Sequence, residues 1–323
     1  MTEFTDALRR AGDAREALLA QLPQTDCLRL FHGATEGTPG LTVDRYGPTL
    51  LIQTFRDPLT EAQHDAIVGT LGEGLLPVWN HRGKSPAGDW YQPAPEALAD
   101  HVGEELGIRY RVRARHRGKD PLLFLDFRVG RRWARAESEG CSVLNLFAYT
   151  GGMGTAAAVG GAAEVWNLDF AASALAVADE NAALNGVETT QVKADAIAAL
   201  RQLSGLGIRG RAARRRRRKF GARQFDRVVL DPPTWATSPF GAVDIVRDYP
   251  SLYKPALLAT ADGGMLLATN HVSTVALEDW LAVLRRCAEK AGRPLKSLEV
   301  IAPEADFPSP DGAHPLKIAV ARL

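Results

Sequence analysis

Three aspartates in the second half of the chain each stand where a buried hydrophobic run ends, a position from which a carboxylate can bind a ligand. Asp169 closes AEVWNLD, Asp195 closes TTQVKAD and Asp231 closes FDRVVLD. Because parallel strands end at one edge of their sheet, we expect these side chains to meet there. Asp169 suits the two hydroxyls of a ribose and Asp195 an adenine amino group, although either could instead cap the helix that follows.

A glycine-rich turn precedes the first of these aspartates. In VLNLFAYTGGMGTAAAVGG, residues 143–161, a buried strand leads through Gly151, Gly152 and Gly154 into an alanine-rich helix. Glycine lets the backbone come close to a ligand, and the helix N-terminus offers free N–H groups to a charged one. Taken alone, the motif also fits a dinucleotide-binding turn, or a tight turn that binds nothing.

The Asp-Pro-Pro corner at residues 231–233 separates these alternatives. Proline cannot continue a β ladder, so Pro232 and Pro233 end the strand and fix a rigid turn. The carboxylate of Asp231 and the carbonyl of Pro232 then point into the crevice, and Trp235 can stack on a planar ring. Such acceptors beside an aromatic residue suit a nucleobase, and a nicotinamide dehydrogenase has no use for them. We therefore predict Asp231, Pro232 and Trp235 as the catalytic residues.

The elements that must position these residues alternate along the chain. Helices are expected to begin near five positions, Thr155, Ala172, Ala196, Asp248 and Ala276, and each is separated from the next by a strand-like run. Such alternation predicts an α/β fold whose Rossmann-like parallel sheet is covered on both faces. The last two strands, SLEVIAP and LKIAVARL, are joined by a loop alone and predict one antiparallel pair at an edge.

The first part of the chain predicts a smaller unit. Residues 1–25 read as an amphipathic helix, and residues 26–107 show short strands punctuated by glycine and proline, with one helix near 59–73. This pattern is typical of a small α+β domain. Residues 108–323 then form the larger domain, which is expected to open with a β-hairpin that turns at Gly118–Pro121.

From about Leu28 onwards the sequence resembles class I S-adenosylmethionine-dependent methyltransferases of the large-subunit ribosomal RNA group. The matching stretches are LTVDRYG (41–47), FLDFR (124–128), LNLFAYTGG (144–152), NAALNG (181–186), LDPPT (230–234) and VRDY (246–249), with Asp169 and Asp195. The resemblance implies a seven-stranded methyltransferase sheet, S-adenosyl-L-methionine as cofactor, and large-subunit ribosomal RNA or its precursor as partner. It implies that Asp231 and Pro232 face the target base. It also implies that Asp126 and Arg128 border the cofactor pocket. The residues that it places around the cofactor are Phe147, Tyr149, Thr150, Gly151, Asp169 and Asp195.

The target atom depends on a departure from part of that group. Members that methylate C5 of cytosine carry a cysteine after the fifth strand, because C5 becomes nucleophilic only once a thiolate has added to C6. Here the segment reads LLATNHVS, with Asn270 and His271 in that place, and Cys27, Cys141 and Cys287 stand elsewhere. The resemblance therefore favours N7 of guanine in 23S ribosomal RNA. Cytosine C5 methylation and a non-catalytic RNA-binding role are the alternatives.

Two further expectations concern a metal and His271. No metal is expected, because the sulfonium is already a good leaving group. His271 fits a polar loop residue better than a proton acceptor.

Basic residues provide the expected grip on RNA. Five arginines recur with period two and so share one face of a strand: Arg109, Arg111, Arg113, Arg115 and Arg117. Like charges on one face repel each other, so we expect this face to bind phosphate groups rather than to face solvent alone. Arg131 and Arg132, at helical spacing, join the predicted RNA-binding set. Nine basic residues and no acid lie in 209–223, whereas the rest of the chain carries more acids than bases. This run predicts either an RNA-binding tail or a solvated insert.

Composition and length are those of an ordinary globular protein. The 323 residues are 46% hydrophobic and 24% charged. No run of about 18 apolar residues predicts a membrane helix, and the N-terminus lacks the features of a secretory signal. Three widely spaced cysteines without metal-ligand spacing fit a reducing cytoplasm. The oligomeric state stays open, a homodimer included.

Overall fold

The computed structural model describes residues 2–84, 90–114, 121–207, 219–238, 241–244 and 248–323, and for 235–238 and 241–244 it describes the backbone only. Contacts divide the chain into two compact units. One comprises Met1–Arg128 and Glu304–Gly312, and the other comprises Val129–Pro303 and Ala313–Leu323. The first unit therefore extends beyond residue 107, the boundary that composition and periodicity suggest.

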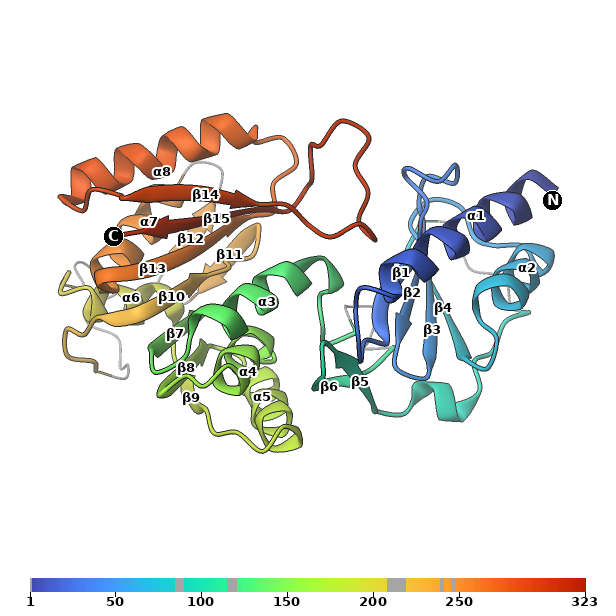
Figure 1. Ribbon diagram of the computed structural model, residues 1–323, viewed down its shortest axis with the longest axis horizontal. Coiled ribbons are helices and arrows are strands. Elements are labelled where there is room, and N and C mark those ends of the chain that lie inside the picture. Colours follow the sequence, from blue (N-terminus) through green and yellow to red (C-terminus); the bar gives the residue numbers. More distant parts are fainter. Residues whose placement is uncertain (1, 85–89, 115–120, 208–218, 239–240, 245–247) are drawn as a thin grey trace. The chain divides into compact units, whose positions relative to one another are not determined.

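The first unit is built on a four-stranded sheet with two helices against it. The strand order is β1-β2-β3-β4, and only the pair β3–β4 among these described strands is parallel. Leu8 of α1, Ile67 of α2 and Trp79 of β4 meet in one core, so both helices cover the same face (Figure 1). The elements are α1 (Thr2–Leu19), β1 (Cys27–His32), β2 (Leu41–Tyr46), β3 (Thr49–Thr54), α2 (Glu61–Leu71), β4 (Leu76–His81) and the 3-10 helices η1 (Pro95–Leu98) and η2 (Leu125–Phe127).

The arginine strand forms a hairpin that the sequence did not predict, and most of the predicted turn at Gly118–Pro121 lies outside the described residues. Strand β6 (Ile108–Val112) pairs antiparallel with β5 (His101–Glu105), the strand that precedes it in the chain. The two strands are joined by Leu106 and Gly107, which have φ of 54° and 77°. Positive φ at both positions gives a tight turn whose twist matches its strands. The stretch FLDFR, expected as the returning strand, instead runs through η2 into a helix.

Arg128 is fully buried in the first unit, and its place at the border of the cofactor pocket stays a prediction. Its guanidinium donates to Asp306 Oδ2 at 2.9 Å, to Glu304 Oε2 at 2.8 Å and to the carbonyl of Cys27 at 2.8 Å, and it lies 3.4 Å from Glu105. A guanidinium enclosed by carboxylates in this way is committed to the protein. It holds the segment 304–312 against the first unit.

Replacing Arg128 by methionine should lower the free energy of unfolding of the first unit by about 3–5 kcal/mol, because Asp306 and its neighbours lose their buried counter-charge. Chemical denaturation of the full chain measures this. The exposed Arg10 of α1 supplies the matched control, Arg10→Met, which should change stability by no more than about 0.5 kcal/mol. Equal stability of Arg128→Met and wild type would contradict the structural role.

The second unit contains a seven-stranded sheet in the order β14-β15-β13-β10-β7-β8-β9. Among its described strands β15 alone runs opposite to the other six, and it pairs antiparallel with both β13 and the edge strand β14. The predicted α/β fold is thus confirmed, as is the antiparallel pairing of the last two strands at an edge, while β13 and β15 form a second antiparallel pair. The elements are α3 (Arg128–Glu137), β7 (Ser142–Leu146), α4 (Gly152–Val159), β8 (Glu164–Asp169), α5 (Ala172–Leu184), β9 (Thr190–Lys193), α6 (Ala196–Leu203), β10 (Phe225–Leu230), β11 (Trp235–Ser238), β12 (Gly241–Asp244), α7 (Tyr249–Ala259), β13 (Thr260–Asn270), α8 (Leu277–Ala291), β14 (Ser297–Ile301) and β15 (Lys317–Arg322).

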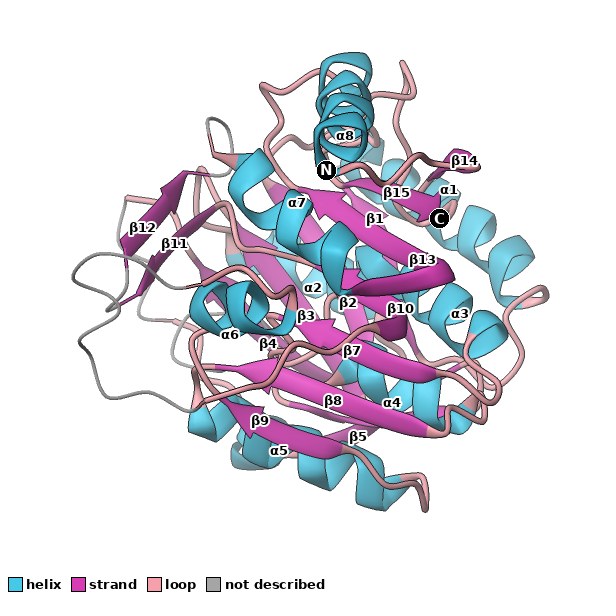
Figure 2. Ribbon diagram, turned by 90° about the vertical axis from the view of Figure 1, so that its left-hand side faces the viewer, coloured by secondary structure: helices cyan, strands magenta, loops and turns pink. Residues whose placement is uncertain are grey.

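Helices cover both faces of this sheet (Figure 2). Helices α6, α7 and α8 pack in succession on one face, and α4 and α5 pack against β7, β8 and β9 on the other. The central strands therefore read as nearly continuous apolar runs, with Leu144, Val228 and Leu266 fully out of solvent. Among the described residues no helix is both long and apolar enough to span a membrane.

Candidate functional site

The carboxyl ends of β8, β7 and β10 lie side by side at one edge of the second sheet. Leu146 of β7 is in register with Leu168 of β8 on one side and with Leu230 of β10 on the other. The next residues along the three strands are Asp169, Phe147 and Asp231. The two carboxylates therefore flank the turn that follows β7, as the strand ends predicted.

The turn after β7 is strained, and Asp169 anchors it. Phe147 and Tyr149 have φ of 57° and 48°, a region that non-glycine residues rarely adopt without support from their surroundings. The Tyr149 N–H donates to Asp169 Oδ2 at 2.9 Å, and the Ala171 N–H donates to Oδ1 at 2.9 Å. Helix α5 begins after Ala171 without a side-chain cap. Asp169 thus organises the turn and does not serve as the N-cap of α5.

The glycines allow this turn and its helix to pack closely. A Cβ on Gly151 would lie 2.6 Å from the Cβ of Ala178, and one on Gly154 would lie 2.0 Å from Asn167 Oδ1. Gly151 also has φ of 71°, so any other residue there would be strained as well as crowded. Their smallness brings α4 against α5 and β8.

Two further predicted cofactor residues, Thr150 and Asp195, are placed by bonds within the second unit. Thr150 is buried, and its carbonyl accepts from Asn181 Nδ2 at 2.9 Å, which ties the NAALNG stretch to the turn. Asp195 caps α6, because its Oδ1 accepts from the Ala198 N–H at 2.8 Å. The capping alternative for Asp195 is therefore realised, and its adenine contact stays a prediction. Asp126 lies in η2 of the first unit and is partly exposed.

The Asp-Pro-Pro corner faces a pair of polar residues from β13 and the loop behind it. Asp231 Oδ1 accepts from Thr269 Oγ1 and lies 2.8 Å from His271 Nε2. The side chains of Asp231 and His271 are 24% and 34% exposed, so both are accessible. Pro232 is buried. Trp235 begins β11, and its side chain lies outside the described part of the chain.

The sequence did not indicate Phe170 as a neighbour of the site, and it did not indicate the partner of His271. Phe170 is 69% exposed directly after Asp169, and an apolar side chain this exposed at a strand end offers a contact surface for a ligand. The sequence signal that could have indicated Phe170 was its position in NLDF (167–170), directly after the strand-end aspartate. His271 is a satisfied polar residue, as expected, but its partner is the candidate catalytic carboxylate. Nothing local in the sequence links positions 40 residues apart.

The arginine strand is a mixed-sign surface rather than a purely basic one. Arg113 donates to both oxygens of Asp100, and this hydrogen bond lowers the pKa of that carboxyl. Arg109 is exposed and stands opposite Glu104 in the hairpin, while Arg111 is partly buried. Arg115 and Arg117 lie outside the described residues.

The remaining basic residues of the prediction have different environments. Arg132 of α3 is exposed, whereas Arg131 is only 4% exposed, so burial does not favour the predicted RNA contact of Arg131, which stays untested. Arg223, at the end of the basic run, pairs with Glu164 and lies over the rings of Trp166 and Phe225, at 5.0 and 4.6 Å. Residues 209–218 of that run lie outside the described residues.

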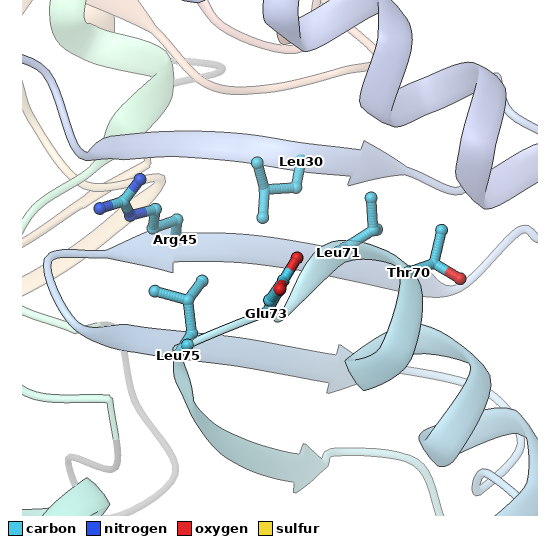
Figure 3. Close-up of a pocket in the computed structure, with 7 residues that line it drawn as sticks. Leu30, Arg45, Thr70, Leu71, Glu73 and Leu75 are labelled. Atoms are coloured by element: carbon cyan, nitrogen blue, oxygen red, sulfur yellow. The ribbon is translucent and has the colours of Figure 1, made fainter.

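A separate cavity of about 360 Å³ opens in the first unit (Figure 3). It contains none of the predicted site residues and is lined by Leu30, Arg45, Thr70, Leu71, Glu73, Gly74 and Leu75. Within the described ranges, no cluster of three or more His, Cys, Asp or Glu side chains is arranged to hold a metal ion.

Comparisons with known proteins agree with this geometry. Residues 28–322 match the family of S-adenosylmethionine-dependent methyltransferases. Ribosomal RNA large subunit methyltransferase I of Aeromonas hydrophila is 30% identical over 322 residues, covering 94% of this chain and 76% of that protein. A ribosomal RNA large subunit methyltransferase of Deinococcus radiodurans is 30% identical over 301 residues, covering 87% and 68%. The structure of SMU.776, a methyltransferase complexed with SAH, has the same fold, with a TM-score of 0.79 at 22% identity over 100% of this chain and 81% of that one.

Proposed function

The chain belongs to the S-adenosylmethionine-dependent methyltransferase family, and from that premise we propose that it methylates a base nitrogen of 23S ribosomal RNA, with N7 of guanine as the target. When bound, the cofactor supplies a methyl group on a sulfonium, which a nucleophile can displace directly. The protein must then bind the adenosyl group, hold the base and exclude water. Its strand tips fit these tasks.

Asp169 suits the ribose of the cofactor. A carboxylate has about four lone-pair sites, and the N–H groups of Tyr149 and Ala171 occupy two of them. One site on each oxygen is left for a ribose hydroxyl. Phe170 beside it would cover the adenine, and Asp195 would accept from the adenine amino group. Phe147, Tyr149, Thr150 and Gly151 would border the adenosyl group through the anchored turn.

The side chains at the end of β13 support methylation of a nitrogen rather than of C5. Covalent C5 chemistry needs a thiol beside the base, but residues 269–272 read Thr-Asn-His-Val, and the first two of these side chains are buried. Cys27 and Cys287 are buried, and Cys141 stands at the opposite, amino end of β7. Instead of a thiol, this tip offers polar side chains bound to Asp231. A ring nitrogen needs no covalent activation, so the site suits nitrogen methylation.

Analysis of the modified nucleoside tests the proposal. The purified protein is incubated with deuterated S-adenosylmethionine and 23S ribosomal RNA, both free and within large-subunit precursors, and the RNA is digested for mass spectrometry. We expect labelled 7-methylguanosine. Labelled 5-methylcytidine would support the cytosine alternative, and RNA binding without any label would support the non-catalytic one.

The exposed arginines should contribute to RNA affinity through phosphate contacts. The double variant Arg109→Gln/Arg132→Gln should bind RNA more weakly, and the slope of log affinity against log salt should fall by about 1 for each contact removed. Fluorescence anisotropy across a salt series measures both. Arg10→Gln in α1 is the control and should leave the slope unchanged. An unchanged slope in the double variant would place the RNA on other surfaces.

A further inference from the structure

Two side chains, one at the end of β13 and one just after it, converge on one oxygen of Asp231. Leu230 of β10 is in register with Ala268 of β13, so Asp231 and Thr269 come next on adjacent strands. Thr269 Oγ1 donates to Asp231 Oδ1, and His271 Nε2 lies 2.8 Å from that same oxygen. The two partners of Asp231 lie 3.4 Å from each other. Both therefore bind one edge of the carboxylate.

The backbone that carries His271 is fixed on both sides. Tyr249 Oη donates to the Thr269 carbonyl at 2.8 Å, and the Val272 N–H donates to Asn270 Oδ1 at 2.8 Å. Lys317 Nζ donates to the Val272 carbonyl at 2.9 Å. This segment follows directly on a strand that is paired on both sides. His271 is thus held in place rather than carried on a loose loop.

The bonds determine what Asp231 can do. An ionised carboxylate only accepts, so His271 must carry its proton on Nε2 to bind it. With donors from Thr269 and His271, Oδ1 has used its two lone pairs, and among the described residues none donates to Oδ2, which is therefore the oxygen for a ligand. The Pro232 carbonyl, on the next residue of the same corner, is the second acceptor that the sequence predicts. Two acceptors in a rigid corner match a base edge that presents two adjacent N–H donors.

We propose that Thr269 and His271 are positioning residues, which hold Asp231 as an anionic acceptor so that the site takes the Watson–Crick edge of a guanine. This inference rests on the proposed function. Guanine presents N1–H and the 2-amino group on that edge, and N7 lies on the other side of the ring system. An edge held at Asp231 and Pro232 therefore leaves N7 for the methyl group.

The fixed charge also suits the reaction. The N7 lone pair forms the new N–C bond, and the electron pair of the broken C–S bond stays on sulfur. The positive charge moves from the sulfonium to the base, and no proton has to leave. A carboxylate already oriented toward the base stabilises that developing charge without reorganisation. Loss of Thr269 or His271 would leave Asp231 free to turn.

Matched variants test the two positioning residues. Thr269→Val and His271→Ala should each slow single-turnover methyl transfer to RNA by about 10- to 100-fold, as loss of an orienting partner typically does, with calorimetric S-adenosylhomocysteine affinity within about twofold. Thr269→Ser and His271→Gln keep a donor and should recover most of the rate. Ser273→Ala, at an exposed position two residues further on, is the control and should match wild type.

A double-mutant cycle separates positioning from general damage. If His271 acts through Asp231, His271→Ala should have little further effect in an Asp231→Asn background. An equal loss in both backgrounds, or a failure of glutamine to restore the rate, would overturn the proposal.

A readout without RNA distinguishes this inference from the proposed function. Nitrogen-15 NMR of the histidine ring should show the proton on Nε2 at neutral pH in wild type, with that signal altered in Asp231→Asn. Nε2 without its proton would overturn the positioning role even if 7-methylguanosine were formed. The expected signal, with methyl transfer found on a base other than guanine, would keep the held carboxylate but overturn the guanine assignment.

Discussion

Replacing Asp231 by alanine should lower the rate of methyl transfer to 23S ribosomal RNA by about 100- to 1,000-fold, the usual cost of removing one preorganised electrostatic group from an active site. Both the acceptor for the base and the negative charge beside it are lost. Cofactor affinity should change little, because Asp169 and the turn after β7 are untouched. Single-turnover transfer of labelled methyl groups measures the first effect, and calorimetry with S-adenosylhomocysteine measures the second.

Two further variants, Asp231→Asn and Asp179→Ala, serve as comparisons for this result. Asparagine keeps the shape of Asp231 and one acceptor but removes the charge, so its rate should lie between those of alanine and wild type. Asp179 is exposed on α5 and serves as the control, for which the wild-type rate is expected. Methyl transfer at the normal rate in Asp231→Ala would refute the role given to this carboxylate.

The second large effect is expected at Asp169, where alanine should weaken S-adenosylhomocysteine binding by about 100- to 1,000-fold. Each hydrogen bond from a hydroxyl to a carboxylate contributes about 1.5–3 kcal/mol, and every 1.4 kcal/mol is about tenfold in affinity. The same substitution removes the acceptor that holds the Tyr149 N–H. The strained residues Phe147 and Tyr149 would then relax, which adds to the loss.

Titration calorimetry measures this loss, with circular dichroism to confirm that the variant is folded. Asp169→Asn is the informative companion. Its amide keeps one acceptor, but its NH2 group can only donate and would oppose one of the two backbone N–H groups, so we expect a loss almost as large. Asp179→Ala again serves as the control. Affinity within a few fold of wild type in Asp169→Ala would show that the ribose lies elsewhere.

Much of the second unit could be predicted because local and global signals agree there. Helices α5 and α6 begin at Ala172 and Ala196, as predicted, since each follows a strand-like run that closes on an aspartate, Asp169 three residues before α5 and Asp195 one residue before α6. The hairpin at Leu106–Gly107 was not predicted, because leucine at positive φ has no sequence signature. Most of the turn predicted at Gly118–Pro121 lies outside the described residues.

The carboxylates of the site could be predicted, but several basic residues and the partners of Asp231 could not. Strand ends are visible in the sequence, so Asp169 and Asp231 were found at one edge. Arg128 is buried by Asp306, a residue 178 positions away, and no local pattern reports such a contact. The bond between Asp231 and His271 likewise depends on β10 and β13 being neighbours, which the strand order of the folded sheet decides.

The most direct test is a crystal structure of the full chain with S-adenosylhomocysteine bound to the second unit. We expect the ribose hydroxyls on Asp169 and the sulfur facing the Asp231–Pro232 corner, across the turn that begins at Phe147. A ligand bound away from these tips, or strand tips closed against one another with the ligand excluded, would contradict the account.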